Sequence, residues 1–77
     1  MAVETSEQLL VDLGFRQVRV RHHGNLARIE VNSDEMEKLM SPDIREAIYS
    51  EIKKAGFTYA ALDLHGYRTG SMNETID

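Results

Sequence analysis

The chain has 77 residues, no cysteine and a formal net charge of −4. A chain of this length forms one small domain, which buries only about 60% of the surface exposed by its unfolded form. The lack of cysteine excludes disulfides, thiolate catalysis and metal sites built on thiolates. The acidic balance disfavours nucleic-acid binding, and no apolar run approaches the roughly 20 residues of a membrane span, so we expect a cytoplasmic domain.

A short helix is the first element expected. Thr5 and Gln8 have the spacing of a capping box, and leucines follow at helical intervals before Gly14. Gly14 suits the left-handed residue that ends many helices, and Phe15 can pack back on Leu10 in a Schellman motif. We therefore expect about two turns of helix between Thr5 and Gly14.

A β-hairpin is predicted next, with strands over about residues 16–23 and 26–31. Apolar and polar residues alternate in both arms, and Gly24-Asn25 supplies the positive-φ residues of a tight turn. Successive side chains leave opposite faces of a strand, so the hairpin has one apolar face and one charged face. The charged face, called the arginine face below, carries Arg19, Arg21, Arg28 and Glu30.

Helical segments and a third strand complete the chain. Ser33 can cap one or two turns, and Ser41-Pro42 begins a second full helix that ends before Gly56. Phe57, just after Gly56, can reach Ile52 as Phe15 reaches Leu10. The last strand is expected over about residues 58–64, with Asp63 on the arginine face. The sequence from Gly66 onward is polar and has no helix or strand period, so we expect a tail over residues 66–77.

The predicted fold is a single α+β domain over residues 1–77, a two-layer sandwich in the order α-β-β-α-β. The expected order of its three-stranded sheet is 2-1-3, with the arginine strand central, because a crossover of this length can skip the neighbouring strand. Both helices should cover the apolar face of the sheet. The arginine face would then have no cover from this chain.

Three guanidiniums beside one carboxylate predict an anion site, because the planar fork of arginine matches phosphate and carboxylate. The site residues would be Arg19, Arg21, Arg28 and Glu30. The alternative is a solvated face with cross-strand ion pairs. No metal site is expected, because the adjacent His22 and His23 point to opposite faces of a strand. The residues alone indicate no bound cofactor and no complete active site.

Several motifs carry a resemblance to a known family. They are V-R-V-R-H-H-G at residues 18–24, A-R-I-E at 27–30 and G-Y-R-T-G-S-M-N-E at 66–74. Together with Gly14-Phe15 and Leu62-Asp63-Leu64, they make the chain resemble the C-terminal domain of the LarE family over about residues 9–74. Members are ATP-dependent sulfur transferases of the PP-loop superfamily, and they act in synthesis of the nickel-pincer nucleotide cofactor.

The resemblance implies a parent enzyme that uses ATP and Mg²⁺ to adenylylate a pyridinium biscarboxylate mononucleotide and then delivers sulfur. This chain has no S-G-G-x-D-S phosphate loop and no cysteine, so the catalytic PP-loop domain is expected outside it and the chain alone should be inert. By resemblance, Arg19, Arg21 and Glu30 lie near the site of the substrate phosphate, and full-length members form homo-oligomers. A docking role for the tail would involve Tyr67, Arg68, Ser71 and Asn73.

Two competing functions stay open on the sequence. In one, the arginine face binds no ligand and only docks the catalytic domain or a neighbouring subunit. In the other, the chain is a small nucleic-acid-binding domain, which the overall acidity and the lack of aromatics on the arginine face apart from Tyr59 disfavour. The source of the sulfur, a cysteine or an iron–sulfur cluster, also stays open.

Overall fold

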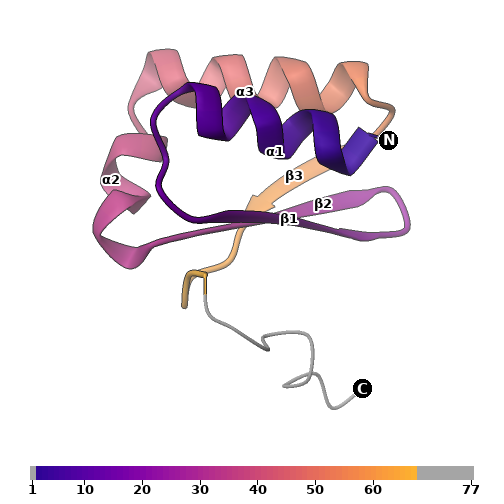
Figure 1. Ribbon diagram of the computed structural model, residues 1–77. Helices are drawn as coiled ribbons and strands as arrows, with labels where there is room; N and C mark the ends of the chain where they lie inside the picture. The colour runs from indigo at the N-terminus through magenta and orange to yellow at the C-terminus, as the bar shows by residue number, and fades with distance from the viewer. Residues whose placement is uncertain (1, 68–77) are drawn as a thin grey trace.

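The computed structural model describes residues 2–67, which form two long helices, a hairpin, a short helical connection and a final strand (Figure 1). The elements are α1 Ala2–Asp12, β1 Val18–His23, β2 Leu26–Val31, the 3-10 helix η1 Ser33–Glu35, α2 Met36–Leu39, α3 Pro42–Lys54 and β3 Tyr59–Leu62. Helices α1 and α3 lie side by side over one face of the sheet, so the α+β two-layer sandwich is confirmed. No helix in the described range is long and apolar enough to cross a membrane.

Helix α1 is longer than the sequence pattern predicts. The capping-box spacing indicates a start near Thr5, but the helix already begins at Ala2. Alanine and glutamate before Thr5 favour a helix interior, and Ser6 is buried. Gln8 donates a hydrogen bond to Asp12 at 2.9 Å, one turn later, in place of a capping contact. The expectation of a two-turn helix is therefore wrong.

Both long helices end in the geometry that their Gly-Phe pairs predict. Gly14 has a φ of 96°, in the left-handed region. The N–H of Phe15 donates to the carbonyl of Leu10 at 3.1 Å, and the N–H of Phe57 donates to Ile52 at 3.3 Å. Each bond satisfies a carbonyl of the last helical turn and directs the chain into the following strand.

The strand order is β1-β2-β3, so the predicted order 2-1-3 is wrong. The Gly24-Asn25 turn joins the antiparallel pair β1 and β2, and β3 adds parallel to β2, with Leu62 opposite Ile29. Helix α1 packs against β1 and occupies part of its outer edge, where the Glu7 carboxylate accepts the Val20 N–H at 2.8 Å. The third strand therefore pairs with β2, and the arginine strand β1 lies at the edge of the sheet.

The core lies between the two long helices and the apolar face of the sheet. Its buried members are Leu10, Phe15, Val18, Val20, Ala27, Ile29, Val31, Leu39, Ile48 and Ile52. They form one cluster that joins α1 and α3 to the hairpin, as the alternation of the strands predicts. His22, which the same alternation places on this face, is exposed near the turn, with its ring centre 6.4 Å from that of Phe57.

Candidate functional site

The face of the sheet opposite the core carries the predicted anion-site residues. Strand β1 contributes Arg19 and Arg21, and β2 contributes Arg28 and Glu30. In the antiparallel register, Arg19 lies opposite Glu30, and Arg21 lies opposite Arg28. Asp63, just after β3, joins the group through Arg28, as its expected place on this face indicates. The structure therefore brings all four predicted residues together and adds a second carboxylate.

Glu30 lies at the centre of an ion-pair network. Its side chain has no exposed surface, and its Oε2 is 2.9 Å from Nη2 of Arg28. Its Oε1 is 3.7 Å from Nε of Arg21. Arg28 also reaches Asp63, with 3.5 Å between Nε and Oδ2. A buried carboxylate persists as an ion only where such partners balance its charge, so Glu30 fixes the positions of two guanidiniums.

Arg19 is held differently from the other two arginines. It is exposed, and its Cζ lies 5.8 Å from the centre of the Tyr67 ring. Within residues 2–67, no acidic side chain lies in ion-pair distance of Arg19, whereas Arg21 and Arg28 both contact Glu30. Among the described residues of this face, three guanidiniums stand against two carboxylates, and Arg19 presents the unbalanced positive charge to solvent.

The arginine face is less open than the sequence predicts. The chain beyond β3 turns back to the end of β2, where the N–H of Tyr67 donates to the carbonyl of Val31 at 2.8 Å. Gly66 packs so closely there that a Cβ atom would stand 2.8 Å from the same carbonyl. The first two residues of the expected tail, Gly66 and Tyr67, are therefore fixed against the end of β2, and Tyr67 lies beside Arg19. The other residues of the expected docking tail, Arg68, Ser71 and Asn73, lie outside the described range.

A second cluster of charges lies just before the start of β1 and links it to η1. Arg16 Nη2 lies 2.7 Å from Oδ2 of Asp34, and the Arg16 backbone N–H donates to the buried Glu35 carboxylate at 3.2 Å. The hydrogen bond and charge of Asp34, followed by those of Glu35, raise the pKa of Arg16 above its usual value. These contacts tie the loop before β1 to η1, so the cluster is structural.

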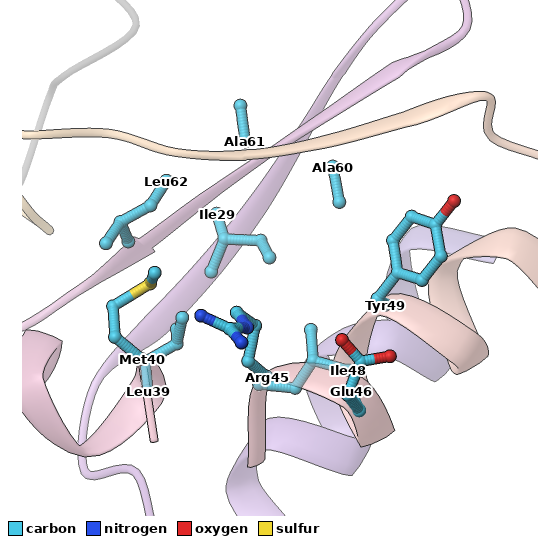
Figure 2. A pocket seen from close by; sticks show the side chains of 10 residues that line it. All are labelled: Ile29, Leu39, Met40, Arg45, Glu46, Ile48, Tyr49, Ala60, Ala61 and Leu62. Atoms are coloured by element: carbon cyan, nitrogen blue, oxygen red, sulfur yellow. The ribbon is translucent and has the colours of Figure 1, made fainter. Parts of the chain in front are cut away.

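A pocket of about 390 Å³ lies on the helix side of the sheet, between α3, the end of α2 and β3 (Figure 2). Its walls are largely apolar and include Ile29, Leu39, Met40, Tyr49, Ala60 and Leu62. The sequence analysis missed this pocket. The sequence does hold a signal for it, since Met40, at the end of α2, and Tyr49, on α3, are large apolar residues outside the apolar stripe of α3. Both are exposed in the structure.

Histidines and acids do not gather into a group able to hold a metal ion in the part of the chain that the structure describes. The arginine face therefore offers donors for an anion, and the pocket offers an apolar surface. These two surfaces are the candidate binding sites that the described residues offer.

Comparison with known proteins finds relatives that are much longer than this chain. The chain is 36% identical over 74 residues to the pyridinium-3,5-bisthiocarboxylic acid mononucleotide synthase of Lactiplantibacillus plantarum. It is 35% identical over 74 residues to an uncharacterized protein of Synechocystis sp.. Each match covers 96% of this chain but only 26% and 28% of the two relatives, respectively. No family model matches the chain.

Proposed function

Since this chain is a LarE-like domain that corresponds to the C-terminal part of its longer relatives, we propose that it is the substrate-side domain of an ATP-dependent sulfur transferase. The relative from Lactiplantibacillus plantarum is named for a mononucleotide, a molecule that carries a phosphate. In this proposal Arg19 and Arg21 bind the phosphate or a carboxylate of a pyridinium biscarboxylate mononucleotide. A separate PP-loop domain of the parent protein uses ATP and Mg²⁺ in the cytoplasm, where ATP is available.

The observation that carries the proposal is the exposed positive charge at Arg19. Arg19 and Arg21 are two residues apart on β1, so their Cα atoms are roughly 7 Å apart and their side chains leave the same face. Two guanidiniums at this spacing can both reach the oxygens of one phosphate. Because no acid of the described chain pairs with Arg19, an incoming anion does not have to displace a carboxylate from it.

Arg28 and Glu30 take a positioning role in the proposed site. Arg28 is bound on one side by Glu30 and on the other by Asp63, so its charge is largely balanced within the protein. Glu30 in turn holds the guanidinium of Arg21, which favours a fixed geometry for anion recognition. Tyr67 borders the site through its ring contact with Arg19.

Titration of the 77-residue chain with inorganic phosphate, followed by amide NMR shifts, tests the proposal. We expect shifts centred on β1 and a loss of affinity of at least about tenfold in the R19A/R21A double variant. R45A removes an exposed arginine from α3, on the other side of the sheet, and serves as the matched control. If the folded double variant binds phosphate as tightly as wild type, the arginine face is not the anion site.

A further inference from the structure

An aromatic side chain, Tyr67, adjoins the proposed anion site. Its ring centre lies 5.8 Å from Cζ of Arg19. A cation contacts an aromatic face within about 6 Å of the ring centre, so Arg19 borders the ring at the outer limit of such a contact and does not lie flat on it. Tyr67 is half-buried, so part of its side chain stays accessible. An aromatic surface therefore adjoins the guanidinium that no acid of residues 2–67 pairs with.

The backbone fixes Tyr67 in this place. Its N–H donates to the carbonyl of Val31 at 2.8 Å. Val31 follows Glu30, which lies opposite Arg19 in the register of β1 and β2, so the bond holds the tyrosine close to that pair. The preceding Gly66 has a φ of 96° and approaches the same carbonyl too closely for a side chain. A tyrosine whose backbone is held has only two torsions left to order, so contact with its ring carries a low entropic cost.

The ligand of the proposed function carries a group that suits this aromatic surface. A pyridinium ring is planar and positively charged, and the face of a tyrosine ring attracts such a cation. Nucleotide bases also stack on aromatic side chains beside a charged groove that holds their phosphates. In a mononucleotide a single ribose joins the phosphate to the ring, so a phosphate bound at Arg19 leaves the ring within reach of Tyr67.

We propose that Tyr67 is the platform on which the ring of a pyridinium mononucleotide stacks while Arg19 and Arg21 hold its phosphate. This inference rests on the proposed anion site and adds its selectivity. Two guanidiniums bind any phosphate ester, so they do not distinguish a mononucleotide from a sugar phosphate. Stacking is an interaction that only the mononucleotide makes, and selectivity is the difference between the two binding free energies. Tyr67 is therefore the specificity-determining residue of the site.

Strand β3 provides a matched control, because Tyr59 belongs to the same face of the sheet. Ala60 packs against the core, so the preceding Tyr59 leaves the opposite side of the strand and is 61% exposed. It lies opposite Leu26, beside the hairpin turn. Arg19 lies opposite Glu30, four residues along β2 from Leu26. Tyr59 is therefore about 13 Å from Arg19 along the strands and about 10 Å across them, out of contact with a mononucleotide held there.

Titration calorimetry of the 77-residue chain with nicotinic acid mononucleotide and with ribose 5-phosphate tests the proposal. The first ligand carries a pyridinium ring, and the second has only the sugar and the phosphate. Wild type should bind the first at least about fivefold more tightly. Tyr67→Leu should lose this preference and bind ribose 5-phosphate within about twofold of wild type, because it keeps both arginines and the backbone bond to Val31. Tyr67→Phe, which keeps the ring, and Tyr59→Leu should both retain the preference.

The outcomes separate this inference from the proposed anion site. If wild type binds neither ligand, or if folded R19A/R21A binds both as tightly as wild type, the anion site is overturned and the platform with it. If wild type binds the two ligands equally, or if the preference persists in Tyr67→Leu, the anion site stands and the platform is overturned. If Tyr67→Leu weakens both ligands by the same factor, Tyr67 only positions Arg19, and the platform is again overturned.

Discussion

Glu30 has the most constrained environment of any charged residue on the arginine face. Glu30→Gln keeps its size but removes the charge that Arg21 and Arg28 share. We expect a loss of about 2–4 kcal/mol in the free energy of unfolding, because two partly buried guanidiniums then lose the charge of the carboxylate that they share. Urea unfolding measures this loss. Glu37→Gln changes an exposed glutamate and should stay within about 0.5 kcal/mol of wild type; equal losses would contradict the central role of Glu30.

Gly66 and Gly24 provide a matched pair of backbone tests. Both have positive φ, at 96° and 61°, but a Cβ at Gly66 would meet the Val31 carbonyl at 2.8 Å, whereas nothing lies within 4 Å of one at Gly24. Gly24→Ala should lower the free energy of unfolding by about 1 kcal/mol, because alanine is less stable than glycine in the left-handed region. Gly66→Ala should cost clearly more in the same urea experiment. Equal losses of stability in the two variants would mean that the backbone at Val31 can move away from the added methyl group without destabilising the domain.

At the scale of an element, helix α1 is held by one buried face. Leu10 is fully buried in the core, whereas the neighbouring Val11 is half exposed. Leu10→Ala should destabilise the domain by about 2–5 kcal/mol, because it removes buried methyl groups and leaves a cavity. Val11→Ala, one residue along the same helix, should change stability by no more than about 0.5 kcal/mol in the same thermal or urea measurement. Similar effects at the two positions would contradict the observed packing of α1.

The elements themselves were largely predictable because their signals are local. The alternation around Gly24-Asn25 predicts both hairpin strands, and the Gly-Phe pairs predict where α1 and α3 end. The sheet order was not predictable in this way. The sheet order depends on contacts between residues distant in sequence, such as that between Glu7 and Val20 and the pairing of β3 with β2, which have no periodic signature.

In the candidate site, too, the features set by local sequence patterns were predictable, and those set by contacts between distant residues were not. Strand alternation alone placed Arg19, Arg21 and Glu30 on one face, as the structure does. Burial of Glu30 and the position of Tyr67 depend on how the aperiodic chain after β3 returns to the sheet, so the expectation of an uncovered face was wrong. Whether the arginine face binds an anion stays a prediction.

At the scale of the whole molecule, one core cluster connects both long helices to the hairpin. Such a domain has no part that could unfold separately with little loss of buried surface, so we expect two-state unfolding. Far-ultraviolet circular dichroism and tyrosine fluorescence should give coincident urea transitions, with an m-value of about 1 kcal/mol per molar urea. Separate midpoints for the two signals would show that the helices and the sheet unfold independently.

The contact between Glu7 and Val20 also limits how far the sheet can extend. A domain with two open edges can add neighbours at both sides and so grow into a fibre. Here, within the described chain, the outward N–H of Val20 is already bound by Glu7, so a strand that added at β1 would have to displace this carboxylate. The bond therefore makes stepwise growth of the sheet into a fibre unfavourable at the β1 edge.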